Sequence, residues 1–217
     1  MEALAVKYRP RTFDDVVEQT SVRKILEQQI ATGTIKNAYL FCGSAGTGKT
    51  TCARIFAREI NKGTGEPIEV DAASNNSVDD VRQIIQQAKT QSLDSEYRIW
   101  VLDECHAFSN NAWQAFLKLL EEPPKKSIFI FCTTNPEKIP ATILSRVQRY
   151  DFKKLSQQAI VDRLKYIIDN ENGGEQPKVQ AKSSTGRLIN AEQPSVSEVA
   201  DEPTDGFGEL NLPFNIE

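Results

Sequence analysis

The stretch Gly43-Ser44-Ala45-Gly46-Thr47-Gly48-Lys49-Thr50 decides the fold of this chain, together with the residues that flank it. Residues 38–42 (AYLFC) are apolar throughout, and the apolar side chains of residues 50–60 (TTCARIFAREI) recur at helical spacing. The octet matches the pattern G-x-x-x-x-G-K-[ST] in full, and the pattern is specific when it joins a strand to a helix. The sequence therefore predicts a strand, a phosphate-binding loop and a helix.

Each residue type in this loop has a chemical role in binding phosphate or metal. Glycines allow backbone amides to turn inward around phosphates, and the first turn of the following helix adds unpaired N–H groups and a positive dipole end. Lys49 supplies a positive charge to the terminal phosphates, and the Thr50 hydroxyl is a ligand for Mg²⁺. The predicted ligands are ATP and Mg²⁺. The residues predicted to bind them are Gly43, Gly46, Thr47, Gly48, Lys49, Thr50, Thr51 and Asp103, with Thr50 and Asp103 on the metal.

Asp103 and Glu104 follow a continuous apolar strand, residues 98–102 (RIWVL). We expect this strand to lie next to the strand that precedes the phosphate loop, so that Asp103 holds Mg²⁺ and Glu104 polarises the attacking water. His106, the single histidine, completes a D-E-x-H string that also occurs in helicases. We expect His106 to be hydrogen-bonded near the edge of the sheet.

Further apolar runs at residues 67–71, 128–132 and 147–152 predict three more strands. Amphipathic segments at residues 78–89, 112–120 and 157–169 predict helices, the first opened by Ser77 and the last by Ser156. Wholly apolar strands that alternate with helices are typical of a parallel sheet covered on both faces. The predicted fold class is therefore α/β, a P-loop nucleotide-binding fold with five parallel strands flanked by helices.

Composition limits the remaining possibilities. The 217 residues are 39% hydrophobic and carry a net charge of −4. No apolar run is long enough to span a membrane and no signal peptide is recognisable, so we expect a cytoplasmic location. Residues 171–217 contain nine acids and three bases, a net charge of −6, which leaves +2 on the first 170 residues.

Four cysteines lie in or beside apolar runs without metal-ligand spacing, so we expect buried thiols and no zinc site.

Several separate motifs resemble one family in its own order. They are Lys7–Val17 (KYRPRTFDDVV), Asp71–Ser74 (DAAS), Leu120–Pro124 (LEEPP) and Ile143–Arg146 (ILSR). Together with the phosphate loop they resemble the gamma/tau subunit of bacterial DNA polymerase III, an AAA+ ATPase of the clamp loader, from about Leu4 to Asp169. In that family Lys7–Val17 lies on the adenine side of the nucleotide.

The resemblance implies further roles. Thr134 would sense the γ-phosphate or the attacking water, and Arg146 would reach as an arginine finger into the ATP site of a neighbouring subunit. With Glu104, these are the predicted catalytic residues. The implied activity is ATP-driven loading of a sliding clamp at primer-template junctions. The implied partners are other clamp-loader subunits, the sliding clamp and primer-template DNA, in a hetero- or homo-oligomer without a membrane. Arg82, near the start of its helix, is either a phosphate contact to DNA or a solvated surface residue.

The chain also departs from the family pattern. Only residues 61–66 stand where the family carries a four-cysteine zinc insert, and Glu18 stands where the family usually has glycine. We expect an AAA+ domain over residues 1–155, a remnant lid helix over 156–170, and a disordered acidic tail over 171–217. In that tail, residues 208–217 (GELNLPFNIE) are a candidate docking motif. We do not expect Arg187 to be the second arginine sensor that the family carries in its lid.

Two other functions remain open from the sequence. A short lid and a missing collar would suit a non-catalytic ATP-binding adaptor of the replication machinery. A D-E-x-H helicase would need a second nucleotide-binding domain, for which too few ordered-looking residues remain.

Overall fold

The computed structural model describes residues 3–90 and 94–173 of this chain. Its described residues lie in one compact unit, Met1–Gln176. The expected disordered tail begins at Glu171, which is the last residue of a helix in the structure. The rest of the tail, with Arg187 and the 208–217 motif, lies outside the described residues.

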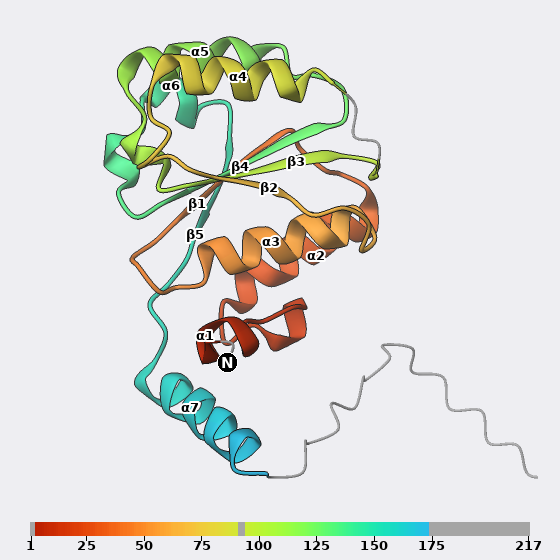
Figure 1. Ribbon diagram of the computed structural model, residues 1–217, viewed down its shortest axis with the longest axis vertical. Coiled ribbons are helices and arrows are strands. Elements are labelled where there is room, and N and C mark those ends of the chain that lie inside the picture. Colours follow the sequence, from red (N-terminus) through yellow and green to blue (C-terminus); the bar gives the residue numbers. More distant parts are fainter. Residues whose placement is uncertain (1–2, 91–93, 174–217) are drawn as a thin grey trace, which may run out of the picture. The chain divides into compact units, whose positions relative to one another are not determined.

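A parallel sheet of five strands forms the centre of the fold, in the order β2-β3-β4-β1-β5 (Figure 1). The strands are β1 Ala38–Cys42, β2 Ile68–Asp71, β3 Arg98–Asp103, β4 Ser127–Thr133 and β5 Gln148–Asp151. All five predicted strands are confirmed within one or two residues. β1 and β4 are buried at every position, as their continuous apolar sequences predict.

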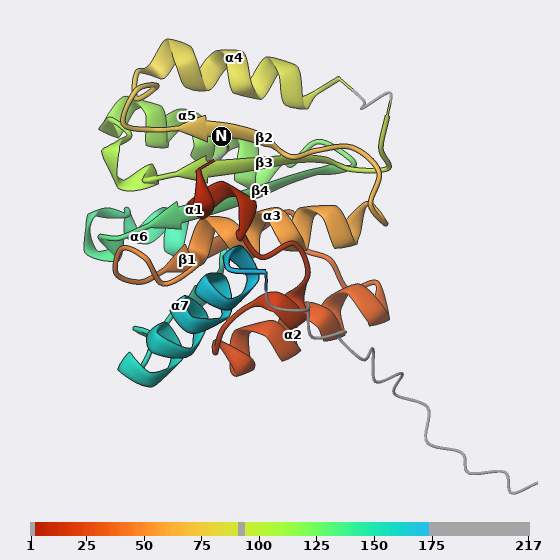
Figure 2. The same ribbon diagram turned by 60° about the horizontal axis from the view of Figure 1, so that its bottom comes forward.

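Helices cover both faces of the sheet (Figures 1 and 2). The α-helices are α1 Leu4–Lys7, α2 Thr20–Thr32, α3 Lys49–Ile60, α4 Val78–Ala88, α5 Asn110–Glu121, α6 Ala141–Leu144 and α7 Gln157–Glu171. Short 3₁₀ turns are η1 Phe13–Asp15, η2 Cys105–Ala107 and η3 Pro136–Lys138. One core cluster packs α2 and α3 against the sheet, and a second packs α4, α5 and α6 against its other face.

The helix boundaries follow local capping chemistry. Ser77, Ser109 and Ser156 each accept a hydrogen bond from a backbone N–H in the first turn, and they begin α4, α5 and α7. Because Ser109 caps α5, that helix begins at Asn110, two residues before the predicted start. It ends at Glu121, ahead of the Pro123-Pro124 pair.

One expectation about the sheet is wrong, and one long helix was not predicted. β3 does not lie next to β1, because β4 pairs with both and separates them. Apolar periodicity did not reveal α2 either, because only Val22 and Leu26 of its thirteen residues are buried. A helix with so narrow an apolar stripe has a weak 3.6-residue signal.

The four cysteines are free and buried, as predicted. Burial raises the pKa of the Cys42 thiol to about 11 and that of Cys52 to about 12, and raises the pKa values of Cys105 and Cys132 well above the usual range. These thiols are therefore protonated and unreactive near neutral pH. Among the described residues, no cluster of three or more histidine, cysteine or acidic side chains is arranged to hold a metal ion.

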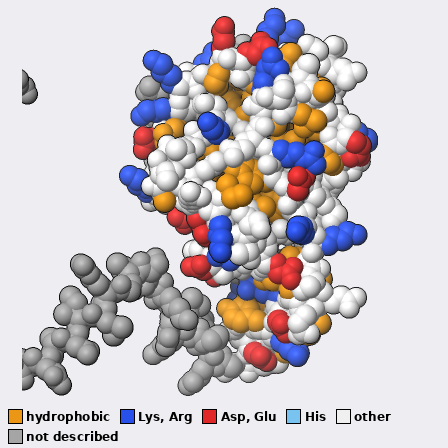
Figure 3. All heavy atoms as spheres, turned by 180° about the vertical axis from the view of Figure 1, so that it is seen from behind, with side chains coloured by type: hydrophobic (Ala, Val, Ile, Leu, Met, Phe, Trp, Pro, Cys, Tyr) orange, Lys and Arg blue, Asp and Glu red, His pale blue; other side chains and the backbone are white. Residues whose placement is uncertain are grey.

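α7 differs from the other long helices because none of its residues is buried. Its apolar side chains Ile160, Leu164 and Ile168 are 46%, 54% and 55% exposed. Figure 3 shows hydrophobic side chains on the lower part of the molecule, where α7 lies in Figure 1, and charges of both signs over the face above it. Within the described part of the chain, no helix is long and apolar enough to cross a membrane.

Candidate nucleotide-binding site

The phosphate loop lies between the carboxyl end of β1 and the start of α3. Gly46 and Gly48 have φ values of 76° and 92°, which favour glycine, and a Cβ atom at either position would meet no atom within 4 Å. Gly43 is different, because a Cβ there would lie 2.6 Å from the Phe152 carbonyl oxygen. Gly43 therefore permits close packing against the segment after β5, while Gly46 and Gly48 shape a loop that faces open space.

The N-terminus of α3 has no side-chain cap, since Gly48 occupies the N-cap position. This contrasts with the serine caps of α4, α5 and α7. Lys49 and Thr51 lie in the first turn of α3. An uncapped helix start behind a glycine loop is the backbone arrangement that binds a phosphate. The residues present thus fit a nucleotide phosphate.

Lys49 is held in place by its own loop. Its side chain is 6% exposed, and its Nζ donates hydrogen bonds to the Gly43 carbonyl at 2.9 Å and the Ser44 carbonyl at 3.1 Å. The Thr47 hydroxyl also donates to the Ser44 carbonyl at 2.9 Å, which tightens the turn. An ammonium group whose partners are neutral carbonyls keeps its full positive charge available to an anion.

Thr50 and Asp103 form the contact that joins the phosphate loop to β3. The Thr50 hydroxyl donates to Asp103 Oδ2 at 2.8 Å, although 53 residues separate them in sequence. A hydroxyl and a carboxylate are the oxygen ligands that Mg²⁺ uses beside phosphates. The two predicted metal ligands are therefore in contact. They come together although β4 lies between β1, which leads into the phosphate loop, and β3, which carries Asp103.

Glu104, Thr134 and His106 meet at the same edge of the sheet. Glu104 Oε2 accepts from the Thr134 hydroxyl at 2.9 Å, and lies 3.2 Å from His106 Nδ1. His106 also lies 3.2 Å from the Thr133 hydroxyl, so the prediction of a hydrogen-bonded histidine at the sheet edge is confirmed. Glu104 has a φ of 46°, in the left-handed region. This backbone conformation costs free energy in a residue with a side chain, and residues that adopt it are often found at functional sites.

Arg146 lies away from this cluster. It precedes β5, whose first residue Gln148 pairs with Tyr39 near the start of β1. The phosphate loop follows the far end of β1, and a five-residue strand is about 16 Å long. Arg146 Nη2 instead bonds Glu121 Oε1 at 2.8 Å, so the LEEPP and ILSR motifs meet on one surface. The guanidinium cannot reach the phosphate loop of its own chain.

Gln19 is a residue of this site that the sequence analysis missed. It is 8% exposed, and its Nε2 donates to the Thr47 carbonyl at 3.3 Å and to the Lys153 carbonyl at 2.6 Å. Its Oε1 accepts from the Lys153 amide at 3.1 Å. Gln19 thereby ties the phosphate loop to the segment that leads into α7. No spacing rule reveals it, because its partners lie 28 and 134 residues away.

Glu18 continues this connection to α7 itself. Its φ is 59°, in the left-handed region that a glycine adopts without strain. Its carboxylate accepts from the Ser156 amide at 3.1 Å and from the Ser156 hydroxyl at 2.6 Å. Ser156 in turn caps α7. Glu18 therefore fastens the start of α7 through Ser156.

We expect Glu18→Gly to loosen the start of α7 without unfolding the chain. The variant removes two hydrogen bonds to a charged group but also relieves a left-handed side-chain residue. Amide exchange at Ser156 should accelerate about tenfold, while amides of α3 exchange as before. Glu137→Gly, at an exposed carboxylate, is the control. Unchanged exchange at Ser156 would contradict the role given to Glu18.

This contact should also depend on pH. The Ser156 hydrogen bonds lower the pKa of the Glu18 carboxyl below its ordinary value. Because the folded-state pKa is the lower one, the contact is complete above the ordinary glutamate range and is lost as the pH falls through the depressed value. Ser156 exchange in the unmodified chain should therefore approach that of Glu18→Gly in acid.

A second pocket lies between the Lys7–Val17 segment and α7. Tyr8 and Tyr166 meet edge to face with ring centroids 6.2 Å apart, and Arg163 donates to the Tyr8 carbonyl at 2.7 Å. Lys7 and the Tyr8 hydroxyl both donate to Glu171 Oε1. Two aromatic rings and several cations therefore line this pocket.

The parallel β2-β3-β4-β1-β5 sheet, with a phosphate loop after β1 and acids after β3, places this chain in the AAA+ class of P-loop nucleotide-binding proteins. Solved structures agree on the fold. The Holliday junction branch migration motor RuvB of Thermotoga maritima superposes with a TM-score of 0.60 at 20% identity, covering 75% of this chain and 53% of that one. A DNA polymerase III gamma subunit-related protein of Thermotoga maritima gives 0.52 at 19% identity, covering 70% and 59%.

Sequence comparison defines the family. The chain is 42% identical over 191 residues to DNA polymerase III subunit tau of Bacillus subtilis, and 34% identical over 214 residues to that of Escherichia coli, covering 78% and 88% of this chain. Residues 66–156 also match the family model of the DNA polymerase III delta subunit. This chain belongs to the gamma/tau family of DNA polymerase III subunits. It spans about one third of the length of these relatives, 34% and 33%.

Proposed function

We propose that this chain is an ATP-hydrolysing subunit of a clamp loader in DNA replication. The observation that carries the proposal is the Thr50–Asp103 hydrogen bond, because it brings the phosphate loop and the acid-bearing strand into one site. Gly43, Gly46, Thr47, Gly48, Lys49 and Thr51 would bind the phosphates, and Thr50 and Asp103 would hold Mg²⁺. The metal, when bound, neutralises charge on the phosphates.

Glu104 is the proposed base for the attacking water. In the structure its carboxylate is engaged by Thr134 and His106, and Thr134 is the proposed sensor of the γ-phosphate. A carboxylate that already accepts two hydrogen bonds, from the amide and the hydroxyl of Thr134, needs a rearrangement before it polarises water. We propose that nucleotide and assembly supply this rearrangement, with Arg146 entering the site of a neighbouring subunit.

The proposed partners are other clamp-loader subunits, the sliding clamp and primer-template DNA, in the cytoplasm where replication takes place. Arg82 lies on α4 and pairs with Asp79 at 2.8 Å, while Ser77 and Asp80 occupy the start of that helix as a capping box. A DNA phosphate would therefore have to compete with Asp79 for Arg82. The division into an AAA+ domain, a lid helix and a tail remains part of this proposal.

Steady-state ATP hydrolysis tests the proposal. Hydrolysis by the chain with its loader partners should rise at least about tenfold when clamp and primed DNA are added together, because an arginine finger alone contributes far more than that factor. Clamp without DNA, and DNA without clamp, are the controls. A rate that no combination raises would contradict the motor function.

A non-catalytic ATP-binding adaptor is the second candidate. The observation that favours it is the exposed apolar face of α7, a helix none of whose residues is buried. The same assay separates the two functions, since an adaptor would bind ATP and hydrolyse it at no measurable stimulated rate. A helicase is the third candidate, and strand separation on a tailed duplex would be its test.

A further inference from the structure

The LEEPP motif contributes no residue to the nucleotide site of its own chain. It lies at the end of α5, whose last residue is Glu121. A carboxylate in the last turn of a helix is opposed by the negative end of the helix dipole, so a nearby cation stabilises it. Arg146 is that cation, because its Nη2 donates to Glu121 Oε1 at 2.8 Å. The motif therefore contacts the residue proposed as the arginine finger.

The guanidinium of Arg146 makes three hydrogen bonds. Its Nη1 donates to the Thr142 carbonyl at 2.7 Å and to the Ser145 hydroxyl at 3.1 Å. Thr142 and Ser145 lie four and one positions before Arg146, so these two bonds restrain the side chain only relative to its own turn. Within the described part of the chain, Glu121 is the one hydrogen-bonding partner of this guanidinium that belongs to another helix. Glu121 therefore fixes the direction of the side chain relative to the rest of the domain.

The carboxylate of Glu121 is itself held by a rigid part of the fold. Leu119 of α5 and Ile143 of α6 are buried in the same core cluster, so the two helices pack together beneath the ion pair. Pro123 cannot continue a helix, and it disfavours helical backbone in the residue before it. Glu122 is accordingly non-helical, with φ −127° and ψ 70°, and α5 ends at Glu121. The prolines thus determine where on α5 the carboxylate lies.

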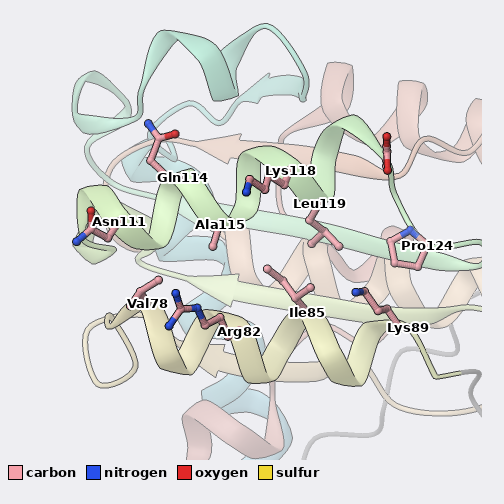
Figure 4. A pocket seen from close by; sticks show the side chains of 11 residues that line it. Val78, Arg82, Ile85, Lys89, Asn111, Gln114, Ala115, Lys118, Leu119 and Pro124 are labelled. Atoms are coloured by element: carbon pink, nitrogen blue, oxygen red, sulfur yellow. The ribbon is translucent and has the colours of Figure 1, made fainter.

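The adjacent acid, Glu122, faces a different surface. It lines a groove between α4 and α5, across which Ile85 and Leu119 point toward one another (Figure 4). Both glutamates are exposed, but it is Glu121 that bonds Arg146. The two acids have the same charge and are neighbours in sequence, so each is a matched control for the other.

We propose that Glu121 is a positioning residue for Arg146, an inference that rests on the proposed trans-acting finger. A guanidinium has more N–H donors than these three hydrogen bonds use, so others remain for a phosphate oxygen in a neighbouring subunit. Immobilising a long side chain costs conformational entropy. The bond to Glu121 restricts the side chain before the subunits assemble, and the loss of Glu121 therefore slows stimulated hydrolysis.

ATP hydrolysis by the assembled complex, with clamp and primed DNA, tests this role. Glu121→Ala should lower the stimulated kcat about tenfold and leave KM for ATP unchanged, because it frees one long side chain and touches no nucleotide-binding residue. Glu121→Gln keeps an acceptor oxygen for Arg146 and should restore most of the rate. Glu122→Ala is the matched control, with the rate of the parent complex expected. Thermal unfolding of the two alanine variants should agree, since exposed ion pairs add little stability.

The outcomes separate this role from the proposed function. If Arg146→Ala lowers the stimulated rate and Glu121→Ala does not, the positioning role is wrong and the finger remains. A faster rate in Glu121→Ala would overturn the role as well, because the ion pair would then restrain Arg146 from acting. An equal loss in Glu122→Ala, or no recovery in Glu121→Gln, would also contradict it. If the parent complex shows no stimulation, or if Arg146→Ala hydrolyses ATP like the parent, the proposed function fails and the positioning role fails with it.

Discussion

Lys49→Ala is expected to weaken the binding of ATP with Mg²⁺ by at least about 100-fold, because hydrogen bonds to charged groups contribute about 1.5–3 kcal/mol each and the ammonium serves more than one phosphate oxygen. The side chain is placed for this role by two neutral carbonyls of its own loop, Gly43 and Ser44. Isothermal calorimetry on the purified chain measures the effect directly.

The matched control is Lys62→Ala, which removes an exposed lysine beyond the end of α3. Thermal unfolding of both variants is needed as well, since Lys49 is buried and its removal takes a donor from the Gly43 and Ser44 carbonyls, of which Ser44 keeps the Thr47 hydroxyl. ATP binding by a folded Lys49→Ala variant at the strength of the parent chain would refute the nucleotide site, and with it the motor function.

Arg146→Ala is expected to leave ATP binding unchanged and to lower stimulated hydrolysis about 1,000-fold in an assembled complex, the lower range of known arginine fingers. Arg146 lies at the amino edge of the sheet and the phosphate loop lies at the carboxyl edge, so its effect must act on a neighbouring subunit. The measurements are calorimetry on the free chain and steady-state hydrolysis in the complex.

Arg149→Ala is the control for Arg146→Ala, because Arg149 is a neighbouring arginine whose ion pair is with Asp151 of its own strand. If Arg146 serves only the surface ion pair with Glu121, then Glu121→Ala and Arg146→Ala will have equal, small effects on stability and none on hydrolysis. That outcome would remove the trans-acting finger from the proposed mechanism.

The sequence was informative wherever chemistry depends on neighbours along the chain. The phosphate loop is a run of eight consecutive residues, and the glycines, the lysine and the threonine that bind phosphate and metal all lie within it. Ser77 and Ser156 predicted the starts of α4 and α7 for the same local reason, whereas the Ser109 cap of α5 was missed. α2 escaped prediction because it buries only two residues and so lacks a strong periodic pattern.

By itself, then, the sequence determined the five strands, the phosphate loop, the cysteine burial and the family, because each depends on apolar runs or contiguous motifs. Only the tertiary structure decided that β4 separates β1 from β3 and that Gln19 reaches Lys153. It alone showed Glu18 fastened to Ser156 and Arg146 paired with Glu121. These contacts join residues 25 to 138 positions apart, and such distances are fixed by the packing of helices on a sheet rather than by any spacing along the chain.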